Sequence, residues 1–222
     1  YRAAYELDPT SQPALRKLAD LLAARKENEE AAKLYQALLV HRRDSMEKGE
    51  TIDVFLRLGA IKNDLGEASK ALNMFEKALE IDPQNAAALE NVMRIYESKE
   101  DHEAILRSKR ALLKSATEDD AKVRTMEEIG DVLAHQLKRP AEALAMYRQA
   151  AELRPESRRV LYKILDILIH QKKWEEAIAV LTKMESFETD PTHSYRLHYT
   201  AAVILRDELN RHDEATRHLD MA

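Results

Sequence analysis

The sequence contains no cysteine, only 4 glycines and 6 prolines, and 5% aromatic residues. The lack of cysteine excludes disulfides, thiolate zinc sites and cysteine nucleophiles. With so few glycines a phosphate-binding loop has little to be built from, and no GxSxG, GxxxxGKS/T or HExxH pattern occurs. We therefore expect no enzyme active site, no cofactor and no metal ion in this chain.

Long apolar runs and a surplus of positive charge are also missing. No stretch approaches the roughly 20 apolar residues that cross a bilayer, which predicts a soluble protein without membrane insertion. The net charge of −5 argues against non-specific binding of nucleic acid, which needs a net basic face. The chain begins at Tyr1 without a signal peptide, so the compartment is unknown, with a cytoplasmic location favoured.

What the sequence has instead is an abundance of helix-forming residues arranged in repeats. In the clearest repeat, residues 52–85, apolar residues recur at intervals of three and four, which indicates two amphipathic helices. Their stripes consist of Phe55, Leu58 and Leu65, then of Leu72, Phe75, Leu79 and Ile81. Gly66 lies between the helices, where a helix-ending residue is expected, and Pro83 ends the second helix.

Two markers recur along the chain. The first is an aromatic residue, an alanine three positions later and a proline five positions after that. It occurs as Tyr1, Ala4 and Pro9, as Phe75, Ala78 and Pro83, and as Tyr147, Ala150 and Pro155. The second is an alanine near the start of each second helix, namely Ala31, Ala71, Ala104, Ala143, Ala177 and Ala215. A period of about 34 residues with occasional insertions predicts stacked helical hairpins.

The small residues have a physical role in such hairpins. Two antiparallel helices pack closely only where a small side chain lets their backbones approach, and Gly59 and Gly130 meet this requirement. We expect Phe75 and Tyr147 to fill the space beyond them. A single hairpin cannot cover its own apolar faces, so each must stack on the next.

These markers resemble the signature of the tetratricopeptide repeat family, which Leu58-Gly59, Gly66, Ala71, Phe75, Ala78 and Pro83 match in one frame. The resemblance spans the whole chain. It implies an all-α, right-handed superhelical solenoid of antiparallel helix hairpins, with about six units after a leading half-unit. The expected units are 1–11 (half), 12–51, 52–85, 86–122, 123–157, 158–194 and 195–222.

We expect one domain over residues 1–222, because neither polar insertion is long enough for a linker. The insertion at residues 44–50 should lengthen the exit of one hairpin, and residues 117–120 should join two units. Both chain ends fall inside a second helix, where terminal units would need polar capping faces. The array is therefore expected to continue in both directions.

In the tetratricopeptide repeat family the first helices line a concave groove that binds partners. The resemblance places these residues on the inward face: Arg57, Asn91, Arg94, Arg124, Arg159, Tyr162, Lys163, Arg196 and Tyr199. In one interpretation the arginines bind carboxylates or carbonyls of an extended peptide, which could be acidic, and the tyrosines anchor it. In the other, cations pair along the groove with acidic neighbours and only keep it solvated. Those neighbours are Asp20, Asp131 and Asp166.

The family's peptide-carboxylate clamp needs particular lysines and asparagines on consecutive first helices. Arg16, Asp20, Arg57 and Asn91 do not match it, so binding of chaperone tails is not expected.

The histidines give weaker signals. His135 and His170 share a phase on adjacent first helices, which would allow a pH-sensitive contact, although incidental surface histidines are more common. Glu214 and His218 share a helical face, and His193, His198 and His212 are near in sequence, but no third zinc ligand is fixed by spacing. We favour a surface helix face at that position.

The sequence thus predicts a scaffold that binds another protein or peptide, and not an enzyme. Two alternatives stay open. The array could assemble with copies of itself into a homo-oligomer, or it could regulate a catalytic or DNA-binding domain elsewhere in a longer chain.

Overall fold

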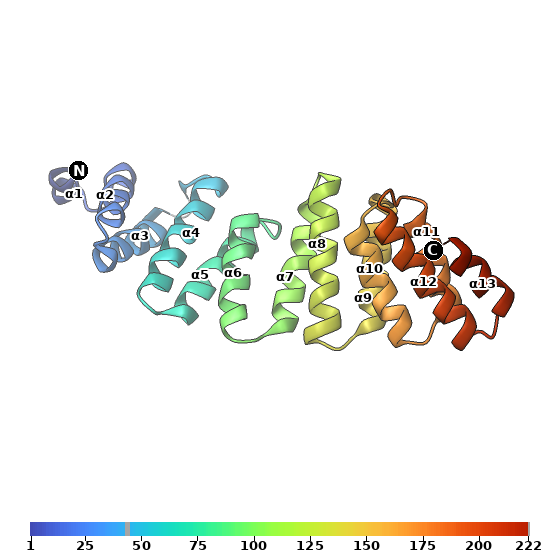
Figure 1. The fold of residues 1–222 in the computed structure, drawn as a ribbon. Helices are drawn as coiled ribbons and strands as arrows, with labels where there is room; N and C mark the ends of the chain where they lie inside the picture. The colour runs from blue at the N-terminus through green and yellow to red at the C-terminus, as the bar shows by residue number, and fades with distance from the viewer. Residues whose placement is uncertain (43–44, 222) are drawn as a thin grey trace. The chain divides into compact units, whose positions relative to one another are not determined.

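The computed structural model describes residues 1–42 and 45–221, apart from the side chains of Ala3, Ala4 and Arg42. Within these residues every regular element is helical, and none is a β-strand. The elements are α1 (Arg2–Leu7), α2 (Gln12–Ala24), α3 (Asn28–Arg42), α4 (Lys48–Asp64), α5 (Ala68–Ile81), α6 (Ala86–Ser98), α7 (His102–Ser115), α8 (Asp119–Asp131), η2 (Val132–Gln136), α9 (Pro140–Leu153), α10 (Arg158–His170), α11 (Trp174–Glu185), α12 (Pro191–Asp207) and α13 (His212–Met221). The all-α prediction is confirmed (Figure 1).

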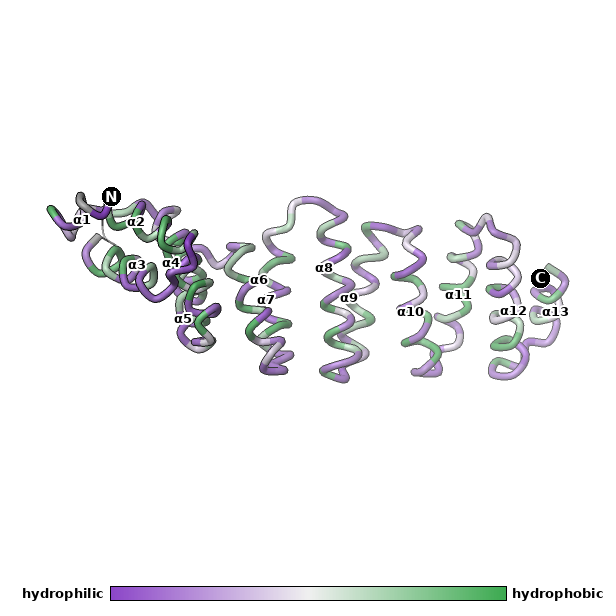
Figure 2. The backbone as a smooth tube through the Cα atoms, turned by 60° about the vertical axis from the view of Figure 1, so that its left-hand side comes forward, coloured by the Kyte–Doolittle hydropathy of each residue, from purple (hydrophilic) through white to green (hydrophobic). Residues whose placement is uncertain are grey.

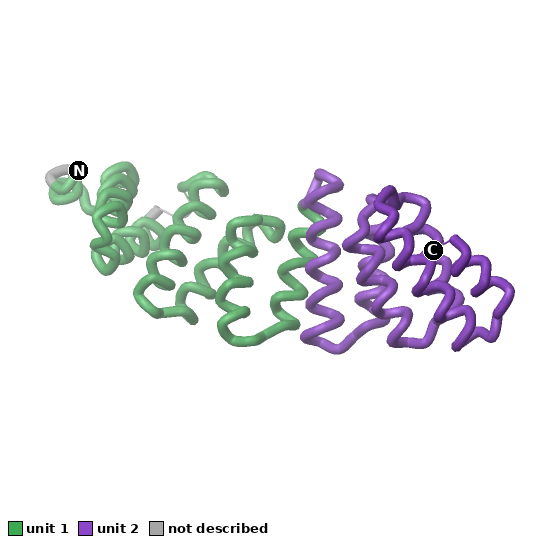
Figure 3. The backbone as a smooth tube through the Cα atoms, in the orientation of Figure 1, with its two compact units in different colours: residues 1–115 green, residues 116–222 purple. Residues whose placement is uncertain are grey.

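The chain forms two compact units, Tyr1–Ser115 and Ala116–Ala222 (Figure 3). The first contains α1 to α7 and the second contains α8 to α13. The division lies just before the polar segment at residues 117–120, of which Asp119 and Asp120 already belong to α8. The single domain expected over residues 1–222 stays a prediction.

Within each unit consecutive helices form antiparallel hairpins that stack on one another (Figure 2). The hairpins are α2–α3, α4–α5 and α6–α7 in the first unit, and α8–α9, α10–α11 and α12–α13 in the second. Each second helix also packs against the first helix of the next hairpin in its unit, as α3 does on α4 and α11 on α12. Apolar faces that one hairpin leaves open are thereby covered by its neighbour.

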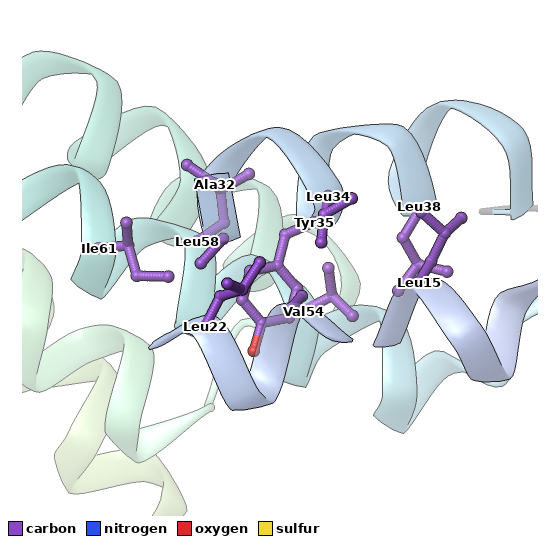
Figure 4. Packing of buried hydrophobic residues seen from close by; sticks show 11 residues of the cluster. Leu15, Leu22, Ala32, Leu34, Tyr35, Leu38, Val54, Leu58 and Ile61 are labelled. Atoms are coloured by element: carbon purple, nitrogen blue, oxygen red, sulfur yellow. The ribbon is translucent and has the colours of Figure 1, made fainter. Parts of the chain in front are cut away.

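A buried cluster in the first unit shows this stacking in side chains. Tyr35 of α3 lies among Leu22 of α2 and Val54 and Leu58 of α4 (Figure 4). Three helices of two successive hairpins thus share one core. Burial of large apolar side chains of this kind contributes about 1.5–3 kcal/mol each, which is the main force that joins neighbouring hairpins.

The close approach predicted at the glycines is confirmed. A Cβ atom added to Gly59 would lie 2.6 Å from Cε1 of Phe75, and one added to Gly130 would lie 2.2 Å from Cε1 of Tyr147. Both distances are far inside van der Waals contact. The aromatic rings of α5 and α9 therefore rest directly on the backbone of the preceding first helix.

Each hairpin turns through one residue with positive φ. Gly66 has φ +76°, as a helix-ending glycine requires, and the N–H of Glu67 donates to the carbonyl oxygen of Lys62 at 2.9 Å. The same left-handed conformation occurs in the other hairpin turns, at Lys26, Glu100, Lys138, Lys172 and Asn210. The sequence pattern indicated only the glycine, because lysine and glutamate disfavour this conformation by about 1–2 kcal/mol.

A π-helical turn marks the first hairpin of the second unit. One residue more separates Gly130 from Tyr147 than separates Gly59 from Phe75. The turn over Val132–Gln136 accommodates this residue, and the N–H of Leu137 donates to the carbonyl oxygen of Val132, five residues back, at 3.0 Å. The ring of Tyr147 keeps its place on Gly130 as a result.

The insertion at residues 44–50 differs in part from the prediction. Arg43 and Asp44 lie outside the described residues. Lys48, Gly49 and Glu50 form the first turn of α4. These three residues therefore lengthen the first helix of the next hairpin. The helix begins after Glu47, whose backbone is extended, and the N–H of Thr51 donates to the carbonyl oxygen of Glu47 at 3.0 Å.

Candidate protein-binding surface

In the first unit the exposed side of α2 and α4 carries a network of ion pairs. Nε of Arg57 lies 3.0 Å from Oδ2 of Asp53, and Nε of Arg16 lies 3.3 Å from Oδ1 of Asp20. Arg16 also bonds to Asp53 across the two helices. These residues line a pocket of about 630 Å³. Although burial would raise the pKa of Asp53, hydrogen bonds from Arg57 and Arg16 hold that pKa below its usual range.

The second unit repeats this arrangement on α8 and α10. Nζ of Lys163 lies 2.6 Å from both carboxylate oxygens of Asp131, and Nε of Arg159 lies 2.5 Å from Oε2 of Glu127. Glu127 is only 3% exposed, and a carboxylate is costly to bury without nearby cations such as these. Burial would raise the pKa of Asp131, but hydrogen bonds from Lys163 and Tyr147 lower it.

A buried tyrosine fixes the aspartate of each network. The hydroxyl of Tyr35 donates to Oδ1 of Asp20 at 2.6 Å, and the hydroxyl of Tyr147 donates to Oδ1 of Asp131 at 2.6 Å. Burial, and then these bonds to a carboxylate, raise the pKa of both tyrosines far above the ordinary range. The sequence contains a signal for these tyrosine–aspartate pairs, although the spacing of apolar residues does not reveal it. In the hairpins of Tyr35 and Tyr147, the small residue of the first helix (Ala19 or Gly130) is followed directly by an aspartate. In the hairpin of Phe75, the small residue Gly59 is followed by Ala60.

Other groups on the first helices of the second unit remain exposed. Tyr162 of α10 and Tyr195 and Tyr199 of α12 are 46%, 48% and 50% exposed. The rings of Tyr195 and Tyr199 stack on each other, with centroids 6.1 Å apart and planes inclined by 13°. Among the described residues of this unit, no carboxylate pairs with Arg124 of α8 or Arg196 of α12.

Two depressions lie along α8 and α10. One, of about 540 Å³, is lined by cations and anions, namely Arg124, Arg154, Arg159, Glu118, Asp120, Glu127 and Glu156 together with Val123 and Ser157. The other, of about 220 Å³, is lined by Tyr147, Tyr162, Lys163, Asp166 and Ile167. Ala134 and His135 of the π-helical turn complete its wall. The surface therefore offers one charged hollow and one more apolar hollow.

Comparisons with known proteins identify this architecture. Models of the tetratricopeptide repeat match residues 11–84 and 134–198. The chain belongs to the tetratricopeptide repeat (TPR) family. As a TPR protein it is a protein-interaction scaffold, and the TPR fold is in general a non-catalytic module. The predicted TPR solenoid fold is thereby confirmed.

Two solved TPR structures are similar in fold. YrrB, a TPR protein with an unusual peptide-binding site, shares 20% identity at a TM-score of 0.50, covering 86% of this chain and 91% of its own. A TPR protein from Parabacteroides merdae shares 16% identity at a TM-score of 0.52, covering 94% of this chain and 77% of its own. At these identities the likeness shows the fold alone. No curated protein matches the chain.

The predicted TPR groove residues fall into three groups. Arg57, Arg159 and Lys163 pair with carboxylates of their own unit. On α6, Asn91 donates to the carbonyl oxygen of Ala87 at 2.8 Å, and Arg94 donates to the side-chain oxygen of Asn91 at 3.4 Å. The remaining four are exposed on α8, α10 and α12: Arg124, Tyr162, Arg196 and Tyr199. A role in binding stays a prediction for all nine.

The histidines follow a different arrangement from the one considered. His170 contacts Asp166 of its own helix, with Nδ1 3.4 Å from the carboxylate, while His135 lines the apolar hollow. His198 and His218 instead lie side by side. Residues 1–42 and 45–221 contain no cluster of three or more side chains that could hold a metal ion. None of their helices has the length and apolarity needed to span a membrane.

Proposed function

We propose that this TPR chain binds an extended segment of a partner protein along the first helices of its second unit. The observation that carries the proposal is the set of exposed groups on α8, α10 and α12. Arg124 and Arg196 have no carboxylate partner among the described residues of this unit, and Tyr195 and Tyr199 present a stacked aromatic surface to solvent. Tyrosine and arginine are the residues that most often dominate binding energy at protein interfaces.

The chemistry of these groups favours an acidic segment with apolar side chains. The guanidinium groups of Arg124 and Arg196 can each bind a carboxylate in bidentate geometry. The hollow lined by Ile167 and Tyr162 has room for one large apolar side chain. Packed helices lie about 8–10 Å apart, a distance that about three residues of extended chain cover. An extended segment can therefore reach these groups in turn.

The paired cations contribute less to this proposal. Arg159 already forms an ion pair with the buried Glu127, and Lys163 bonds to Asp131. A ligand carboxylate would have to compete with these internal partners. We infer that Arg159 and Lys163 mainly hold α10 against α8, whereas Arg124 and Arg196 face the partner.

The test begins with a display library of random peptides of about 12 residues, selected on the full chain. We expect the selected peptides to be enriched in aspartate or glutamate beside aromatic or aliphatic residues. For one such peptide the dissociation constant is then measured by fluorescence anisotropy for the wild type and for the double variant Arg124→Glu, Arg196→Glu. Binding should weaken at least about tenfold, or about 1.4 kcal/mol.

The matched control is Arg107→Glu, which reverses an exposed charge on α7, a second helix of the first unit. It should leave peptide binding unchanged. Equal affinity of the double variant and the wild type, with intact helicity, would remove the two arginines from the site. Arg159 is left unchanged because a glutamate there would face Glu127 and disturb the fold.

Self-assembly is the competing outcome, because the exposed rings of Tyr195 and Tyr199 could also pack against a second copy of the chain. Sedimentation equilibrium of the full chain over a hundredfold range of concentration separates the two functions. A constant monomer mass supports binding of a different partner. A mass that doubles with concentration, and returns to the monomer in Tyr195→Ala, would assign the tyrosine surface to self-association.

A further inference from the structure

Two histidines face each other between the last two helices. His198 of α12 is 6% exposed, and its Nδ1 lies 3.0 Å from Nδ1 of His218 on α13. The ring centroids are 5.3 Å apart, with planes inclined by 49°. On its other side, Nε2 of His198 lies 3.5 Å from Oε1 of Glu185, the last residue of α11. A carboxylate and two imidazoles thus connect three consecutive helices.

The surroundings of the histidine pair, His198 and His218, are apolar apart from a few charges. Leu181, Leu197 and Ala201 line the same small cavity, together with Thr182. The charged groups that face the pair are Glu185 from α11, and Glu214 and Arg217 from α13. Glu214 is itself held by Arg211, whose Nε lies 2.6 Å from Oε1. His198 is buried and His218 is half-buried, so solvent screens the two rings from each other only in part.

The number of protons decides whether the contact can exist. When both rings are neutral, one Nδ1–H donates to the other Nδ1, and Nε2–H of His198 points to Glu185. One added proton still leaves a single N–H between the two Nδ1 atoms. With two added protons both Nδ1 atoms carry hydrogen, and two cations face each other at 3.0 Å without an acceptor. The doubly protonated pair must separate.

We propose that the histidine pair makes closure of the α12–α13 hairpin depend on pH, with the hairpin closed at neutral pH and opening in acid. This dependence on pH is a property of the hairpin itself and goes beyond the proposed function. It nevertheless has a consequence for that function, because α12 also carries Tyr195, Arg196 and Tyr199. Acid would loosen the helix that supports this surface.

The direction follows from proton binding. Burial first, and then the neighbouring His198, lower the pKa of His218 below its ordinary value, although Glu185 and Glu214 oppose this. The open hairpin then binds protons at a higher pH than the closed one. The neutral histidine pair therefore stabilises the closed hairpin at pH values above the ordinary histidine pKa. This stabilisation is lost as the pH falls below that value.

Hydrogen exchange of the full chain tests the proposal, with rates corrected for the intrinsic effect of pH. Between pH 7.5 and pH 5.0 the opening constant of α13 should rise about tenfold or more relative to that of α10. His218→Gln should remove this dependence, because glutamine does not titrate. His212→Gln, on the same helix but outside the pair, should keep it. A pH-independent α13 in the wild type, or an unchanged dependence in His218→Gln, would overturn the proposal.

A second measurement uses only the wild type, so it remains informative even if a variant fails to close the hairpin. Long-range ¹H–¹⁵N NMR spectra of the wild type report the protonation and the tautomer of each imidazole. We expect two protonation steps separated by at least about one pH unit, with one Nδ1–H shared at neutral pH. Two independent titrations, both near the ordinary value of about 6.5, would refute the coupled pair.

Discussion

Replacing Gly130 by alanine tests the packing on which the second unit depends. The added Cβ would lie 2.2 Å from Cε1 and 2.6 Å from Cζ of Tyr147, so the ring or the backbone must shift. The ring has little freedom, because Tyr147 is 1% exposed and its hydroxyl bonds to Asp131 at 2.6 Å. Asp131 is in turn held by Lys163. The substitution therefore presses against a side chain that is fixed at both ends.

The expected magnitude is the difference of two effects. Alanine is favoured over glycine in a helix by about 0.8–1 kcal/mol. Overpacking of a well-packed core costs about 1–3 kcal/mol, and the short distances place this site at the upper end. We expect Gly130→Ala to destabilise the second unit by about 1–2 kcal/mol. Gly59→Ala should cost less, because Phe75 has no hydroxyl bond that holds its ring.

Urea unfolding followed by circular dichroism measures the total effect. Because stacked hairpins can unfold in separate steps, hydrogen exchange of α8 and α9 measures the local effect. A loss of about 1.4 kcal/mol raises the local opening constant about tenfold. In the double variant Gly130→Ala, Tyr147→Leu the narrower side chain should relieve the clash, so the two changes together should cost less than their sum.

Gly49→Ala is the matched control. Gly49 also lies in a helix, but a Cβ there would meet nothing within 4 Å. Its substitution should be neutral or stabilising by up to about 1 kcal/mol. If Gly130→Ala were as stable as the wild type, the close contact of Tyr147 with α8 would not exist, and the role assigned to the glycine would be wrong.

Two further predictions concern other hairpins. Lys172→Gly should stabilise α10–α11 by about 0.5–1 kcal/mol, because Lys172 has φ +55°. Ala179→Gly, in the middle of α11, should destabilise it by about 1 kcal/mol in the same urea titration, and equal effects of the two would contradict the role of the turn. Phe75→Tyr should cost about 1–2 kcal/mol by burying a hydroxyl without an acceptor. Ala60→Asp should restore at least about 1 kcal/mol in that background by reproducing the pair of Tyr147 and Asp131, and no recovery in thermal unfolding would refute it.

The cations of the first helices differ in whether a carboxylate of the same unit pairs with them. Pairing dominates where a cation meets a carboxylate on a neighbouring first helix, as Arg16 does at Asp53 and Lys163 at Asp131. It does not occur at Arg196 within the described part of the second unit. Exposed ion pairs contribute little to stability, so their main effect here is to occupy cations that would otherwise be open to a partner.

The repeat pattern was enough to predict the helices, their pairing into hairpins and the contact of small residues with aromatic ones. These features repeat with a fixed spacing, and a helix with 3.6 residues per turn converts spacing directly into a buried face. Gly66 could be assigned to its turn because glycine is the residue that adopts positive φ without strain. Gly59 and Gly130 could be matched to Phe75 and Tyr147 because each glycine and its aromatic residue recur at nearly the same spacing.

The polar contacts between helices could not be predicted from the repeat pattern. Arg159 and Arg196 occupy corresponding positions in the repeat, yet only Arg159 forms an ion pair with a carboxylate among the described residues of the unit. His198 and His218 come together because α12 and α13 fold back on each other at one particular register. Such contacts depend on distances of a few ångströms between side chains on different helices. Periodicity along one chain sets the face on which a residue lies, but not the neighbour that reaches it across the hairpin.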